Sequence, residues 1–216
     1  MGVPPRAAYH HGNLRNALID AGVELAREHG PDAVVVREAS RRVGVSHNAA
    51  YRHFPDRDSL LRAVAERSMA ALARRMEERI AKVDPRDTSA DAARRRVRAT
   101  GEAYVAFATE EPGWFRSAFA IPDSKHQLVE EQDEGVGASG LGPFGLLNAQ
   151  LDGLLTAGGI TQRQRVNADT VAWAAVHGLS MLLIDGPLRE LPKAERRRVI
   201  ERLLDTIEAG WAGLEP

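Results

Sequence analysis

Residues 36–54 read VREASRRVGVSHNAAYRHF, and this stretch decides the fold. Its apolar spacing predicts two short helices, over about 36–43 and about 47–53. Gly44 allows the tight turn between them, and Ser46 is a suitable N-cap for the second helix. Two short helices joined by a glycine-containing turn form a helix-turn-helix, whose second helix enters the major groove of DNA. The stretch therefore predicts a DNA-binding motif.

The second helix of this motif has the composition of a DNA-reading helix. Two alanines keep it slim, and its other side chains form hydrogen bonds. The amide of Asn48 can pair with an adenine edge. Ser46, Tyr51 and His53 suit phosphates, which orient a protein without specifying sequence; packing is the alternative for Tyr51, and Phe54 is expected in the core. The predicted DNA-contacting residues are Arg37, Ser46, His47, Asn48, Tyr51, His53 and Arg57.

Outward from this motif, helical periodicity covers most of the chain, and no alternating strand pattern occurs. A first helix is expected from about Asn13, and a long fourth helix runs from the cap Asp56 to about Ile80. Later helices are predicted after a break at 84–87, and over about 114–120, 144–155, 168–184 and 194–211, with a loop at 121–142. The expected fold is all-α: an N-terminal three-helix helix-turn-helix domain (9–72), joined by a long helix to a C-terminal helical bundle (86–216).

Composition and charge narrow the class of protein. The chain has 216 residues and a net charge of −1. It contains no cysteine, which excludes disulfides and thiolate-bound zinc. Residues 1–80 carry 13 arginines against 10 acidic residues, so the front of the chain is mildly basic. No signal peptide and no apolar run of about 20 residues is evident, which predicts a cytoplasmic protein without a membrane partner.

Signatures of catalysis and of metal binding are missing from the sequence. It contains no Ser-His-Asp pattern, no phosphate-binding glycine loop and no metal-spaced cluster, so no enzyme activity, cofactor or metal is expected. His10 and His11 are too few ligands for a metal; they either contact the DNA backbone or contact nothing. A DNA-binding architectural protein without a ligand, and more remotely a helical enzyme, are the rival interpretations.

Two further motifs carry a resemblance to a known family. Residues 51–61, YRHFPDRDSLL, and residues 9–15, YHHGNLR, resemble the DNA-binding domain of the TetR family of repressors, over roughly 9–72. Residues 173–178, WAAVHG, resemble the hallmark of the branch with a WHG-type C-terminal domain. The resemblance implies a homodimer that binds operator DNA and is released by a small-molecule effector. One departure is Val34-Val35-Val36, since the family usually has a Ser or Thr just before the second helix to cap it, and a valine cannot form a cap.

The C-terminal half supplies candidates for the two remaining surfaces. Its last two predicted helices can pair with those of a second subunit as a four-helix bundle. The predicted dimer-interface residues are Met181, Ile184, Ile200, Leu203, Leu204, Ile207 and Trp211. The predicted ligand-binding residues are Tyr104, Phe107, Trp114, Phe115, Gln150, Trp173 and His177. This composition favours a largely apolar effector. For each aromatic residue, packing in the core is the alternative. The glycine-rich residues 135–142 are a candidate lid for the site.

Overall fold

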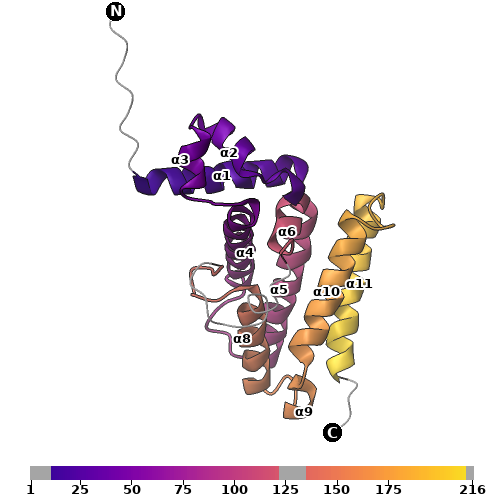
Figure 1. The fold of residues 1–216 in the computed structure, drawn as a ribbon. Helices are drawn as coiled ribbons and strands as arrows, with labels where there is room; N and C mark the ends of the chain where they lie inside the picture. Colours follow the sequence, from indigo (N-terminus) through magenta and orange to yellow (C-terminus); the bar gives the residue numbers. More distant parts are fainter. Residues whose placement is uncertain (1–10, 122–134, 213–216) are drawn as a thin grey trace, which may run out of the picture.

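The structure is a computed structural model that describes residues 11–121 and 135–212 (Figure 1). Within these ranges all regular structure is helical, which confirms the all-α prediction. No helix there is long and apolar enough to cross a membrane. The predicted arm with His10 and most of the predicted 121–142 loop lie outside the described residues.

Three helices form the N-terminal head: α1 (His11–His29), α2 (Val36–Val43) and α3 (His47–Tyr51), with a short 3-10 turn at Pro31–Ala33. Gly44 ends α2 in the left-handed conformation, at a φ of 75°. The Ser46 hydroxyl accepts a hydrogen bond from the Ala49 amide at 3.3 Å and caps α3, as predicted. Val35 leaves α2 without a side-chain cap. The helix-turn-helix therefore forms, although α3 ends two residues earlier than predicted.

The long helix α4 (Arg57–Ile80) connects the head to the rest of the molecule. Asp56 begins it with a capping box, because its carboxylate accepts from the Ser59 amide at 2.7 Å while the Ser59 hydroxyl accepts from the Asp56 amide at 3.4 Å. Its first turns bury Leu60 and Val64 against the head, and its later turns bury Leu72 within the bundle. One continuous hydrophobic core consequently runs from the head into the bundle.

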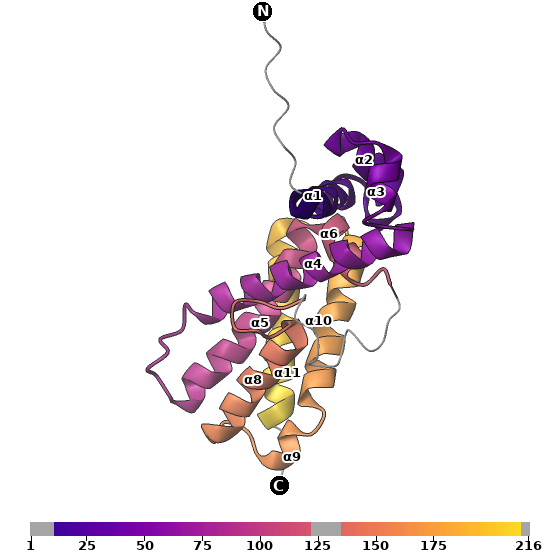
Figure 2. The ribbon, with the colours of Figure 1, turned by 60° about the vertical axis from the view of Figure 1, so that its left-hand side comes forward.

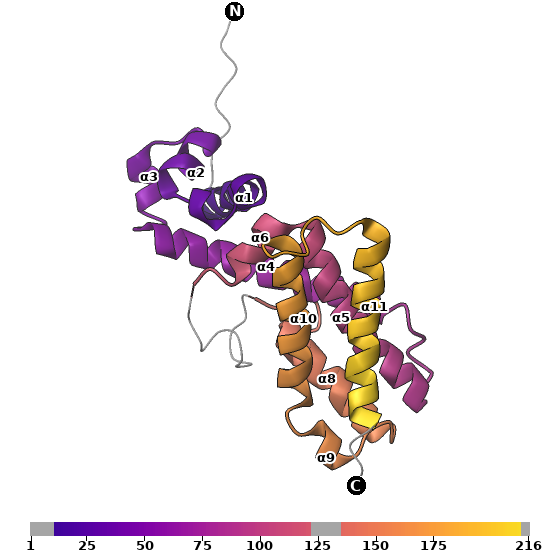
Figure 3. The same ribbon diagram turned by 90° about the vertical axis from the view of Figure 1, so that its right-hand side faces the viewer.

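The bundle contains α5 (Ala90–Glu110), α6 (Pro112–Ala118), α8 (Pro143–Thr156), α9 (Gln162–Arg165), α10 (Ala168–Ile184) and α11 (Lys193–Ala212). Figure 2 shows α4 running obliquely between the head and this bundle, and Figure 3 shows α10 and α11 side by side on one face. The short helix α6 begins at Pro112, a residue suited to the first helical position, and lies between the bundle and α1. The sequence did not predict α9, which has only four residues.

Candidate DNA-binding head and ligand-binding core

Helix α3 presents a polar face on the surface of the head. His47, Asn48 and Tyr51 are exposed, with Tyr51 at 47% of its full area. Tyr51 lies three residues after Asn48 and four after His47, so it neighbours both on the helix surface. Ala50 and Phe54 are buried behind them and fix α3 on the core. Among the described residues, no hydrogen bond engages the side chains of these three. The predicted groove-facing residues are therefore brought together and available, and Tyr51 does not pack in the core.

The other predicted DNA contacts occupy different places. Arg37 on α2 is exposed, and His53 lies half-buried after the end of α3. Arg57 also has partners within the head, because its guanidinium donates to the Pro31 carbonyl at 3.0 Å and to Asp32 Oδ1 at 3.3 Å. These bonds give Arg57 a role inside the head, where it ties the start of α4 to the turn after α1.

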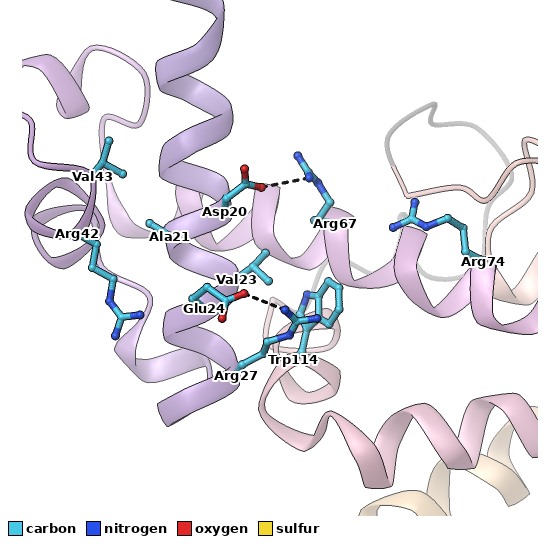
Figure 4. Close-up of a pocket in the computed structure, with 10 residues that line it drawn as sticks. All are labelled: Asp20, Ala21, Val23, Glu24, Arg27, Arg42, Val43, Arg67, Arg74 and Trp114. Carbon is cyan, nitrogen blue, oxygen red and sulfur yellow. Dashed lines mark hydrogen bonds and ion pairs between the residues drawn. The ribbon is translucent and has the colours of Figure 1, made fainter. Parts of the chain in front are cut away.

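A groove of about 500 Å³ marks the junction of head and bundle (Figure 4). It lies between α1, the end of α2, α4 and α6. The Arg27 guanidinium of α1 lies 4.2 Å from the ring centroid of Trp114 on α6 and pairs with Glu24 at 2.8 Å and Glu111 at 3.2 Å. Arg67 of α4 pairs with Asp20 at 3.3 Å. The contacts of Arg27 with Trp114 and Glu111, and of Arg67 with Asp20, therefore join α1 to α6 and α4 along this groove.

Helix α6 also approaches the end of α1 very closely. A Cβ built at Gly113 would lie 2.1 Å from the carbonyl oxygen of Ala26 and 3.0 Å from that of Arg27, so only glycine fits at this contact. On its other side, α6 is tied to the end of α10. Both carboxylate oxygens of Asp185 accept from the Arg116 guanidinium, at 2.6 to 3.0 Å. Helix α6 therefore joins α10 to the head.

An aromatic cluster surrounds His177 in the bundle, and we call Tyr104, Phe115, Phe119, Trp173 and His177 the aromatic core. The Tyr104 hydroxyl and His177 Nδ1 are 2.8 Å apart and share a hydrogen bond. The rings of Phe119, Trp173 and Phe115 lie 4.7, 5.5 and 5.9 Å from the imidazole, centroid to centroid. Burial lowers the pKa of His177 and raises the pKa of Tyr104. Both groups are therefore neutral near pH 7.

The aromatic core contains four of the seven predicted ligand-binding residues. Trp114 does not belong to it, because Arg27 covers its ring at the junction with the head. Phe107 packs on Trp114 with ring centroids 5.5 Å apart. Gln150 is half-buried on α8 and forms no hydrogen bond within the described ranges. Sequence reasoning missed Phe144, whose ring stands edge-on to Trp173 at 6.3 Å; a helix-starting phenylalanine carries no signal of its partner.

The outer face of α10 differs from the predicted dimer interface. Ile184, Leu204 and Trp211 are each at most 7% exposed and belong to the core of their own subunit. Met181, Ile200, Leu203 and Ile207 are half-buried against that core. The exposed apolar residues of α10 are instead Val171, at 59%, and Leu182, at 44%, and the exposed Ala174 and Gly178 lie between them at helical spacing. The prediction failed for the first three because periodicity identifies a helix face without identifying what covers it.

Both parts of the chain match families of known proteins. Residues 18–64 match the family described as "Bacterial regulatory proteins, tetR family", and residues 97–207, about half the chain, match the "Tetracyclin repressor-like, C-terminal domain". A curated relative from Bacillus subtilis, the uncharacterised HTH-type transcriptional regulator YobS, is 24% identical over 122 residues. That alignment spans 56% of this chain and 60% of the length of YobS.

Two solved structures share the whole architecture. A protein of unknown function from Rhodococcus sp. RHA1 is 28% identical, with a TM-score of 0.74 over 96% of this chain and 100% of that one. A variant of TetR from Acinetobacter baumannii AYE, in complex with minocycline, is 19% identical, with a TM-score of 0.62 over 97% and 99% of the two chains. With its helix-turn-helix head and its C-terminal bundle both matched, the chain belongs to the TetR family of transcriptional regulators.

Proposed function

We propose that the protein is a dimeric repressor that binds its operator through α3 and leaves it when a small, largely apolar molecule enters the aromatic core. The observation that carries the proposal is the hydrogen-bonded pair of Tyr104 and His177, enclosed by aromatic rings. Ligand sites are mostly apolar with a few placed polar groups. A neutral imidazole and a neutral phenol supply one donor and acceptor pair for an uncharged ligand. The Acinetobacter relative binds minocycline, but 19% identity carries only the fold over to this chain.

The roles on DNA follow from side-chain chemistry. Asn48 reads an adenine edge through its amide, while Tyr51, His53, Ser46 and Arg37 contact phosphates. The WHG-type branch and the domain limits of 9–72 and 86–216 belong to the same proposal.

Two heads act together in this proposal, because the family binds DNA as a dimer. The exposed apolar face of α10, from Val171 to Leu182, pairs with the same face of a second subunit, and the half-buried residues of α11 border it. Small residues such as Gly178 allow the two helices a close approach. The paired heads then reach successive major grooves about 34–36 Å apart.

Release follows from the position of α6. A ligand that enlarges the aromatic core displaces Phe115 and Phe119, which lie on α6 and directly after it. Because Gly113 is docked on α1, that displacement changes the orientation of the head. The ligand weakens DNA binding only to the extent that it prefers the displaced state.

The test begins with an operator selected from random DNA by the wild-type protein. Uncharged aromatic compounds are then screened for release of this duplex, with wild type compared with Trp173→Ala and His177→Ala. The expected result is a higher ligand concentration for half-release in both variants, with unchanged DNA affinity. Gln162→Ala is the control, since this exposed residue of α9 belongs neither to the aromatic core nor to the predicted ligand-binding residues. Unchanged release by both folded, dimeric variants would assign these residues to the core alone.

A further inference from the structure

The carboxylate of Glu77, near the end of α4, is held by the loop that precedes α8. Residues 135–142 form this segment, which we call the glycine loop. Glu77 Oε2 accepts from the Ala138 amide at 2.9 Å, and Oε1 accepts from the Ser139 amide at 2.8 Å and from its hydroxyl at 2.6 Å. These three hydrogen bonds attach the glycine loop to α4, although Ala138 and Ser139 lie 61 and 62 residues after Glu77 in the sequence.

The glycine loop is shaped for this carboxylate. A Cβ at Gly137 would lie 2.4 Å from Glu77 Oε1, so a larger residue would displace the carboxylate. The loop also closes on itself, since the Gly137 amide donates to the Leu141 carbonyl at 2.9 Å. Gly140 supports the turn with a φ of 78°, in the left-handed region.

The charge of Glu77 persists in this position. Burial opposes its ionisation, but the hydrogen bonds from Ser139 and Ala138 outweigh burial and hold the pKa of Glu77 below its usual value. Arg74, one turn earlier on α4, adds to this effect. The attachment is therefore a charge-assisted one at any pH near neutrality.

The glycine loop leads directly to the aromatic core. Phe144 lies in the first turn of α8, just past the loop, and its ring stands edge-on to that of Trp173, with the centroids 6.3 Å apart. Glu77 lies on the helix whose other end carries the head. A continuous series of contacts therefore runs from Trp173 through Phe144 and the loop to α4, separate from the route through α6.

We propose that Glu77 is a positioning residue that couples the aromatic core to the DNA-binding head by fixing the glycine loop to α4. This inference rests on the proposed function, because it assigns a second route for the same response. It also assigns residues 135–142 the role of a fixed coupling element, in place of the lid expected from their glycine content. Breaking the attachment leaves the head and α3 intact but reduces the communication between them and Trp173.

Coupling between two sites is reciprocal, so DNA can replace the unidentified effector in the test. The full-length protein is labelled with 5-fluorotryptophan, and the fluorine signal of Trp173 is assigned with Trp173→Phe. Wild type is titrated with the duplex that it selected from random DNA. The expected result is a shift of the Trp173 signal on DNA binding.

Glu77→Gln provides the test, because an amide nitrogen that cannot accept replaces one carboxylate oxygen, so the side chain loses its charge and can no longer accept from both backbone amides. The variant is expected to bind the duplex within about twofold of wild type, with less than about half of the wild-type shift at Trp173, as a loss of coupling requires. Ser139→Ala removes only the hydroxyl contact, and a partial loss is expected. Glu78→Gln is the matched control, since the neighbouring Glu78 is exposed and makes no such contact.

The possible outcomes test the role of Glu77, the coupling and the proposed function separately. A full Trp173 shift in Glu77→Gln and Ser139→Ala overturns the role of Glu77, while the proposed function stands. A wild type that binds DNA without any shift at Trp173 overturns the coupling itself. A wild type that selects no sequence overturns the proposed function. Should Glu77→Gln fail to fold, Ser139→Ala and Glu77→Asp, which keeps the carboxylate one methylene shorter, carry the decision through the same measurement.

Discussion

Replacing Gly113 with alanine tests the contact through which α6 holds the head. Alanine normally stabilises a helix relative to glycine, by about 0.5–1 kcal/mol. At Gly113 the new methyl would lie 2.1 Å from the Ala26 carbonyl oxygen, and ordinary contact begins near 3.4 Å. Both partners are backbone atoms, so no rotamer change relieves the overlap. Helix α6 must then move away from α1 by about 1.3 Å, the difference between these two distances.

The magnitude follows from this displacement. Forcing an extra methyl into a packed contact costs about 1–3 kcal/mol, more than the gain in helix propensity. Gly113→Ala is therefore expected to be less stable than wild type by about 1–3 kcal/mol. The head follows α6, and a reorientation that costs about 1.4 kcal/mol lowers operator affinity about tenfold.

Gly153→Ala is the control, since this glycine lies within α8 and a Cβ there meets nothing within 4 Å. Replacing glycine with alanine at this position should raise the free energy of unfolding by about 0.5–1 kcal/mol. Urea denaturation at one fixed protein concentration compares the two variants, because unfolding of a dimer depends on concentration. A gel-shift titration measures operator affinity. Equal stability of the two variants would refute the close docking of α6 on α1.

The remaining predictions concern the DNA face, the dimer and the buried histidine. Asn48→Ala should weaken binding at particular base pairs by about 1–3 kcal/mol, whereas Tyr51→Phe should weaken all sequences alike; equal, sequence-independent losses in a binding-site selection would exclude base reading by Asn48. Val171→Glu combined with Leu182→Glu should give monomers in sedimentation, and a persistent dimer would place the interface elsewhere. His177 is held neutral, with its pKa lowered by burial, so its stabilising contribution is present above the unfolded pKa of about 6.5 and is lost as pH falls from there toward the folded pKa. Replacing His177 with Gln should remove this part of the pH dependence of unfolding, and an unchanged slope would contradict it.

Local signals in the sequence predicted the head well. Helix α2 lies where predicted because Gly44 ends it through a conformation that few other residues adopt. Ser46 and Asp56 begin α3 and α4 because each cap satisfies a backbone amide close in sequence. These signals depend on contacts three or four residues apart, which a single sequence displays directly.

The bundle was harder to predict, because its decisive contacts join distant residues. The aromatic side chain of Trp114 and its place near converging helices predict a ligand-binding residue, and only the fold shows that Arg27 covers its ring. Leu204 packs against Gly101 of α5, so its side chain is not available to a dimer interface. The hydrogen bonds between the glycine loop and Glu77 join residues about sixty positions apart, and helical periodicity in the sequence cannot predict such a contact.

Because the hydrophobic core continues from the head into the bundle, the head cannot be exchanged as an independent module. Leu61, Val64 and Leu72 belong to one buried cluster with Phe107 and Phe115, so the head has no closed core of its own. A fragment ending at residue 72 would expose the faces of α1 and α4 that α6 covers. Heat or urea should accordingly melt both parts in one transition. An engineer who exchanges heads between relatives must therefore transplant the matching surface of α6 together with α4, or the chimaera will lose stability before specificity can be measured.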